Sequence, residues 1–112
     1  MEPIYIHDDA KLREYFDIAE TYRYEMKANG VTISAEISMA TAWYNYYTRL
    51  LDLTNNAIAT YNNYDASLEL YPGKTIADEI RELKESIPDI VYCLKLSSDH
   101  LYELIRDNPL IF

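Results

Sequence analysis

Residues 34–62, SAEISMATAWYNYYTRLLDLTNNAIATYN, decide the fold of this chain. One stripe of side chains recurs in this stretch at alternating steps of three and four, the a/d spacing of a helix that packs at a shallow angle on a neighbour. Its members are Ile37, Ala40, Tyr44, Tyr47, Leu51, Thr54, Ile58 and Tyr61. A second stripe runs beside it and contains Met39, Trp43, Tyr46, Leu50, Leu53 and Ala57. A helix with two adjacent apolar stripes is typical of a position between two other helices, so we expect this helix to be central.

A helical segment is predicted on each side of the central one. The first covers residues 9–29, because Asp8 or Asp9 can cap its start and Asn29-Gly30 is a strong stop signal. Thr32 or Ser34 can cap the central helix. The residues before the first helix, 2–7, are expected to be an extended lead-in.

The third helix is predicted to begin at residue 75. Pro72-Gly73 is a turn signal, and Thr75-Ile76-Ala77-Asp78 resembles a capping box with Asp in place of Glu. The segment 75–87 then carries its own apolar stripe up to Pro88, which should end or kink the helix because proline lacks an N–H and clashes with the preceding turn.

The same apolar spacing continues beyond Pro88, which leaves two arrangements open. Either one long helix kinks at Pro88, or Ser86 caps a fourth helix over 88–107 with the proline in its first turn. Asn108-Pro109 closes this region and leaves an apolar tail at 110–112. The sequence therefore predicts a single all-α domain over residues 1–112, a bundle of three long helices, or of four if the last is split.

The composition limits the classes of function. The chain of 112 residues has 19 acidic and 10 basic side chains and a formal net charge of −9. This charge disfavours direct binding of nucleic acid and suits a protein partner with a basic surface. The first five residues form no targeting leader, and no apolar run approaches the roughly 20 residues of a membrane helix. We expect a cytoplasmic protein, in a bacterial host if a phage encodes it, with no membrane contact.

The residues that usually carry catalysis are scarce. His7 and His100 lie far apart, and Cys93 lies between apolar neighbours, as a small core residue would. Gly30 and Gly73 are isolated, so no glycine-rich phosphate loop can form. The sequence does not exclude a pair of carboxylates for acid–base chemistry, since any helical bundle can bring two acidic side chains together. We therefore predict a protein that is not an enzyme, with no catalytic residue, no metal site and no cofactor.

Four acidic residues recur at steps of four, three and four, which places them on one face of the third helix. We call this set the acidic ridge: Asp78, Glu82, Glu85 and Asp89. Side chains with this spacing are about 5–6 Å apart, close to the spacing of phosphates along one nucleic-acid strand. The functional interpretation is a phosphate-mimicking surface for a basic groove. The alternative is a solvated face with ion pairs such as Arg81–Glu85.

The central helix also carries an aromatic segment that covers most of its circumference. Its members are Trp43, Tyr44, Tyr46 and Tyr47. Tyr and Trp are favoured interface residues, so these rings are candidates for binding a partner or a second copy of the chain. The alternative is that all of them belong to the core of the three-helix packing.

The order of elements resembles the layout of small phage terminase subunits. The resemblance is carried by a helix, then Gly30-Val31-Thr32, a helix with Trp43 and Tyr47, a Pro-containing turn and a final helix. It implies an oligomeric virion or DNA-packaging component. The basic residues expected of such a DNA-packaging protein are missing from this chain.

These observations together favour a small acidic, non-enzymatic protein-binding module. The expected type is a phage or mobile-element inhibitor that occupies the basic groove of a host nucleic-acid-binding defence protein, similar in character to anti-CRISPR proteins. One alternative is the terminase-like packaging component. Another is an immunity or antitoxin protein that sequesters a basic toxin.

Overall fold

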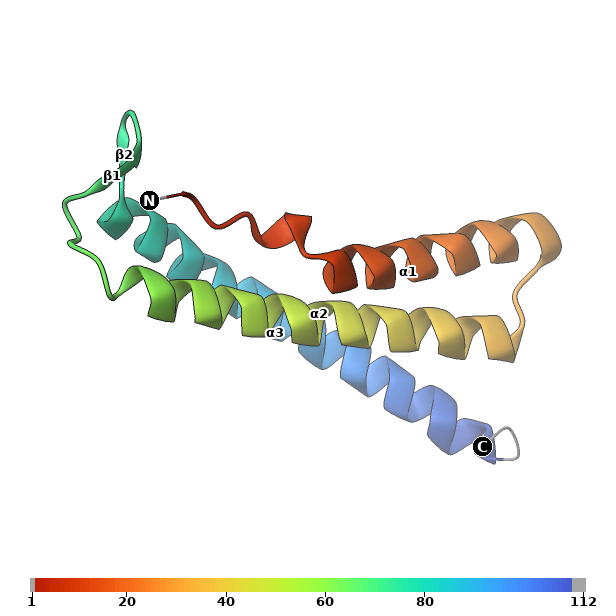
Figure 1. The fold of residues 1–112 in the computed structure, drawn as a ribbon. Coiled ribbons are helices and arrows are strands. Elements are labelled where there is room, and N and C mark those ends of the chain that lie inside the picture. The colour runs from red at the N-terminus through yellow and green to blue at the C-terminus, as the bar shows by residue number, and fades with distance from the viewer. Residues whose placement is uncertain (1, 110–112) are drawn as a thin grey trace.

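The computed structural model describes residues 2–109 and consists mainly of three long helices (Figure 1). These are α1 (Ala10–Asn29), α2 (Ile33–Tyr61) and α3 (Ile76–Asp107). A 3₁₀ helix, η1 (Ile6–Asp8), precedes them, and a small hairpin of β1 (Glu69–Tyr71) and β2 (Lys74–Thr75) joins α2 to α3. The predicted all-α class is confirmed.

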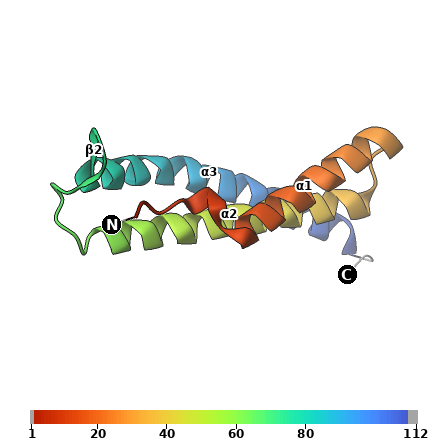
Figure 2. The ribbon, with the colours of Figure 1, turned by 45° about the horizontal axis from the view of Figure 1, so that its top comes forward.

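The three helices are arranged in an open row with α2 in the middle. Both α1 and α3 pack along α2, whereas α1 and α3 make almost no contact with each other. In both views α3 crosses α2, and its C-terminal part emerges on the side of α2 opposite to α1 (Figures 1 and 2). The molecule is accordingly elongated, 55 × 25 × 18 Å. The central position expected for the second helix is confirmed.

Side-chain caps fix the starts of the helices where the sequence predicts them. The Leu12 N–H donates to the Asp9 carboxylate over 2.9 Å, and the Ala35 N–H donates to the Thr32 hydroxyl over 3.1 Å. Gly30 ends α1 with φ of +88°, a conformation that favours glycine. Thr75 and Asp78 form the predicted capping box, each side chain accepting from the other's backbone N–H.

Of the two arrangements left open at Pro88, the structure has the single long helix, and the alternative split into 75–87 and 88–107 does not occur. Helix α3 is continuous from Ile76 to Asp107, and Pro88 lies inside it with an exposed side chain. The Ser86 hydroxyl donates to the Leu83 carbonyl over 2.7 Å and does not cap a new helix. Packing on both sides of the proline explains the continuity, because Leu83 packs against the core and Ile90 is buried. Apolar burial on both sides offsets the lost backbone hydrogen bond.

Two small elements differ from the sequence-based expectation. The lead-in is not extended throughout, since η1 forms over Ile6–Asp8. The region before α3 contains the short antiparallel hairpin, with Pro72-Gly73 at its turn and Gly73 at φ of +88°. Strands of three and two residues are too short to show an alternating pattern. The apolar tail at 110–112 lies outside the described residues.

The best-packed part of the core lies where the hairpin, the end of α2 and the start of α3 meet. Ala57, Tyr61, Leu70 and Ile76 form a buried cluster there, with Ile6, Ile80 and Leu83 packed against it. Tyr61 is 1% exposed, and its hydroxyl accepts a 2.7 Å hydrogen bond from the Ile4 N–H. This bond attaches the N-terminal segment to the end of α2.

Asp9 should make the stability of the protein sensitive to acid. Besides capping α1, its carboxylate accepts two hydrogen bonds from the Arg49 guanidinium on α2, at 2.7 and 3.1 Å. The Arg49 bonds and the Leu12 N–H lower the pKa of Asp9 from 3.8 to about 2. A carboxyl with a depressed pKa in the folded state stabilises the fold above its unfolded-state pKa and loses this contribution as pH falls through its folded-state pKa.

We therefore expect the wild-type melting temperature to fall as pH drops from 3.8 to about 2, and to fall less steeply in Asp9→Asn. Asparagine keeps the helix cap but cannot ionise. Thermal melts followed by circular dichroism across this range would measure the difference. Asp17→Asn, at an exposed position on α1, is the matched control and should keep the wild-type slope. Equal slopes for Asp9→Asn and wild type would contradict the assignment.

Candidate protein-binding site

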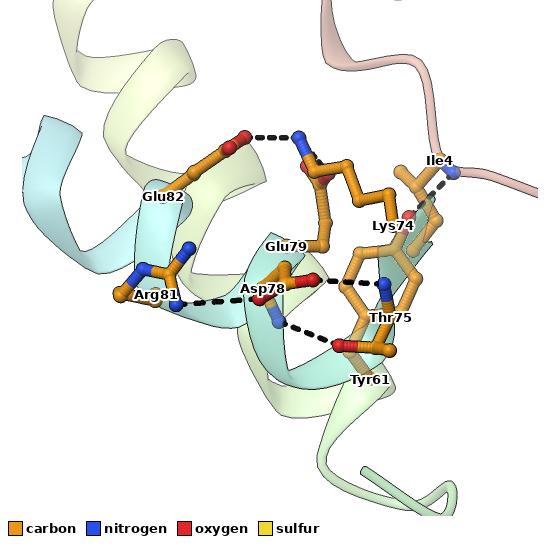
Figure 3. Close-up of polar contacts among 8 residues, drawn as sticks. All are labelled: Ile4, Tyr61, Lys74, Thr75, Asp78, Glu79, Arg81 and Glu82. Carbon is orange, nitrogen blue, oxygen red and sulfur yellow. Dashed lines mark hydrogen bonds and ion pairs between the residues drawn. The ribbon is translucent and has the colours of Figure 1, made fainter. Parts of the chain in front are cut away.

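The four carboxylates of the acidic ridge do not present a uniform surface. Asp78 bonds within the capping box and pairs with Arg81 at 3.3 Å, and Glu85 lies 4.0 Å from the same guanidinium. Glu82 pairs with Lys74 (Figure 3). Among residues 2–109, Asp89 is the one ridge member for which no ion pair forms. The N-terminal part of the ridge is therefore largely neutralised by the chain's own cations.

Lys74 is the residue that the sequence-based interpretation of the ridge missed. The hairpin holds Lys74 beside the first turns of α3, where its ammonium lies 3.1 Å from the Glu79 carboxylate and also bonds Glu82 (Figure 3). These bonds, that of Glu82 foremost, raise the pKa of Lys74. Helical spacing cannot reveal this contact, because it depends on the path of the hairpin.

A cleft of about 540 Å³ lies between the N-terminal segment, α2 and α3. Its lining includes four acidic residues, Asp8, Glu79, Glu82 and Asp89, and we call it the acidic cleft. Leu50 and Thr54 from α2 and Leu83 and Ile90 from α3 supply an apolar lining. Asp78 and Glu85 do not line this cleft; Glu85 lies with Arg81 and Lys84 along a separate groove.

The acidic cleft combines two predicted ridge residues with two that the sequence did not single out. Glu82 and Asp89 belong to the ridge, whereas Glu79 and Asp8 do not. Helical spacing could have identified Glu79. Residues 79, 82, 86 and 89 recur at steps of three, four and three, so they lie on one face of the helix, and this face shares Glu82 and Asp89 with the ridge. Asp8 carries no such signal, because only the tertiary fold brings η1 to α3.

The charge and shape of the cleft suit a cationic group on an apolar stem. Lys74 is the cation that compensates Glu79 and Glu82, and among the described residues Asp8 and Asp89 form no ion pair. Lysine and arginine side chains place an aliphatic stem against apolar surface and a charged head among carboxylates. The cleft can thus accept basic side chains of another protein.

The aromatic segment is mainly engaged in packing within the chain. Trp43 meets Phe16 of α1 edge-on with ring centroids 5.9 Å apart, and it also contacts Tyr46 and Tyr47. Burial first, and then the neighbouring Cys93 of α3, raise the pKa of Tyr47. Tyr44 is 37% exposed and is the one member of the segment that faces outward. Three of the four predicted rings therefore link the helices to one another.

No protein-family model matches the chain, and comparisons with curated proteins and with solved structures give no match. Within residues 2–109, no group of three or more His, Cys, Asp or Glu side chains is placed to hold a metal ion. In the same range, no helix is both long and apolar enough to cross a membrane. The acidic cleft and the charge of the chain are therefore the features that bear on function.

Proposed function

We propose that this protein is a small acidic binding module that receives basic side chains of a partner protein in the acidic cleft. The supporting observation is that Asp8, Glu79, Glu82 and Asp89 line one cleft together with apolar residues. The module acts by occupying a surface and not by catalysis. It belongs by this proposal to the phage or mobile-element inhibitors of host nucleic-acid-binding defence proteins.

The link to a nucleic-acid-binding partner comes from charge. Proteins that bind nucleic acid line their grooves with lysine and arginine, which contact phosphates along the strand. A protein of net charge −9 is attracted to such a groove, and its cleft can take up the side chains that would otherwise contact phosphate. Occupation of the groove then excludes nucleic acid. An immunity or antitoxin protein would use the same chemistry against a basic toxin.

The first test measures whether the cleft, and not net charge alone, binds cations. We expect wild-type protein to bind a fluorescent nine-residue arginine peptide, and Asp8→Lys/Asp89→Lys to bind it at least about tenfold more weakly. Fluorescence anisotropy at low and physiological salt gives both affinity and salt dependence. Glu25→Lys/Asp52→Lys is the matched control, because it changes the net charge equally at two exposed positions outside the cleft. Equal losses in both double variants would reject the cleft as the site.

A second measurement tests the functional class. We expect the wild-type protein to displace labelled duplex DNA from a purified DNA-binding defence nuclease of a candidate host, and Asp8→Lys/Asp89→Lys to fail to do so. If the peptide binds in the cleft but DNA never competes, the immunity or antitoxin class is favoured. Tyr44→Ala, which removes the exposed ring of the aromatic segment, should leave displacement unchanged.

A further inference from the structure

The ammonium of Lys74 lies among groups that are typical of a cation-binding position. It lies 3.1 Å from the Glu79 carboxylate and bonds the Glu82 carboxylate (Figure 3). The ring of Tyr71, which pairs with Lys74 across the hairpin, has its centroid 6.0 Å from the same ammonium. Carboxylates and aromatic faces are the groups with which proteins hold ammonium and guanidinium ions. Lys74 thus makes, within the chain, the contacts that a basic side chain of another protein would make.

This contact divides the acidic residues of the cleft into two pairs. Glu79 and Glu82 bond Lys74, whereas Asp8 and Asp89 form no ion pair within residues 2–109. Glu79 and Asp89 are ten residues apart on one helix, about 15 Å along its axis. A single basic side chain therefore cannot pair with both. A partner with several basic side chains meets one pair of carboxylates that already holds a cation and another that does not.

The hairpin fixes the backbone of Lys74 but leaves its side chain able to move. Leu70 is buried in the core cluster, and the Ile76 N–H donates to the Leu68 carbonyl over 2.8 Å. These contacts attach the hairpin to the end of α2 and the start of α3. The ammonium of a lysine is carried on a flexible four-carbon stem. It can therefore leave the two carboxylates by rotation about side-chain bonds, without any change in the fold.

We propose that Lys74 is a built-in competitor that a basic side chain of the partner displaces from Glu79 and Glu82. The inference rests on the proposed function of the acidic cleft and adds a regulatory contact to it. While the ammonium is in place, these two carboxylates are not available to the partner. The apparent dissociation constant is then raised by the inverse of the fraction of molecules in which Lys74 has left.

The competitor gives the cleft a preference among basic partners. A partner with one basic side chain gains little at Glu79 and Glu82, because one cation only replaces another there. A partner with two or more also pairs with Asp8 or Asp89, where no ion pair within residues 2–109 is lost. Lys74 thus favours surfaces with several basic side chains over isolated ones. Grooves that bind nucleic acid are surfaces of this kind.

Removal of the competing charge should strengthen binding. We expect Lys74→Met to bind the fluorescent nine-residue arginine peptide at least about threefold more tightly than Lys84→Met does, by fluorescence anisotropy at low salt. Lys84→Met is the matched control, because it removes the same charge at an exposed position of α3 outside the cleft. Lys74→Arg keeps a cation at the position and should bind as the wild type does.

The outcomes separate this inference from the proposed function. If the wild type binds the peptide and Lys74→Met binds no more tightly than Lys84→Met, Lys74 is not a competitor and the cleft remains the site. The same conclusion follows if Lys74→Arg binds as tightly as Lys74→Met. If neither the wild type nor Lys74→Met binds the peptide, both proposals fail.

Lysine footprinting on the unaltered protein gives a second measurement that needs no variant to fold. An amine-reactive acetylating ester attacks the neutral amine, and Glu82 and Glu79 raise the pKa of Lys74. Lys74 should therefore react more slowly than Lys84 in the protein alone, as mass spectrometry would show. The arginine peptide contains no lysine, and at saturation it should make Lys74 react faster while Lys84 keeps its rate. A Lys74 that reacts at the same rate or more slowly with the peptide bound overturns the proposal.

Discussion

Replacing Tyr61 with alanine should lower the free energy of unfolding by about 3–5 kcal/mol, as truncation of a fully buried aromatic residue does. Tyr61 is 1% exposed and belongs to the cluster that joins the end of α2, the hairpin and the start of α3. The neighbouring chain is held by helix and hairpin hydrogen bonds, so it cannot collapse to fill the space. Urea denaturation followed by circular dichroism would measure the change.

Two further variants separate the contributions at this position. Tyr61→Phe keeps the ring but leaves the Ile4 N–H without its 2.7 Å acceptor, which should cost about 1 kcal/mol. Tyr64→Ala removes a ring that is 45% exposed and should have a much smaller effect. If Tyr61→Ala were no more destabilising than Tyr64→Ala, this cluster would not be the core of the fold.

The Tyr61 hydroxyl also connects the fold to the proposed site. Its bond to Ile4 holds the N-terminal segment, and that segment contributes Asp8 and one side of the acidic cleft. Removal of the hydroxyl therefore takes away one attachment of this segment without altering any charge. The lining of the cleft therefore depends on the position of the N-terminal segment as well as on the residues of α3.

Local signals in the sequence were sufficient for most of the secondary structure. Asp9, Thr32 and Thr75 each cap a helix within two residues of the predicted start, because capping depends on a side chain and the three or four residues that follow it. The central place of α2 followed from its two stripes. These features depend on near neighbours in the chain, which a single sequence displays.

The features that were missed depend on contacts between distant segments. Lys74 reaches Glu79 and Glu82 because the hairpin turns back over α3, and Asp8 reaches the cleft because Tyr61, the packing of Ile6 and the Asp9–Arg49 pair hold the N-terminal segment. The acidic ridge lies on one helix, as its spacing predicts, whereas helical spacing cannot show which residues of other segments lie beside it. In the same way, the sequence displays the aromatic segment but not its partners. The ring of Trp43 packs against Phe16 of α1, a contact between distant parts of the chain.

Pro88 shows how tertiary packing can override a local signal, and it yields the second large expected effect. Pro88→Ala should raise the free energy of unfolding by about 1–3 kcal/mol. The proline lies inside α3, where it removes one backbone hydrogen bond and its ring crowds the preceding turn. Its side chain is exposed, so alanine loses little packing while restoring the bond.

Thermal and urea denaturation would measure this gain. Glu103→Ala, an exposed change to alanine in the same helix, should shift stability by less than about 0.5 kcal/mol and so controls for helix propensity alone. A stabilised Pro88→Ala means that α3 tolerates the proline because Leu83 and Ile90 are packed on either side of it. An unchanged or lowered stability would instead mean that the proline sets a helix direction that the packing of α3 on α2 requires.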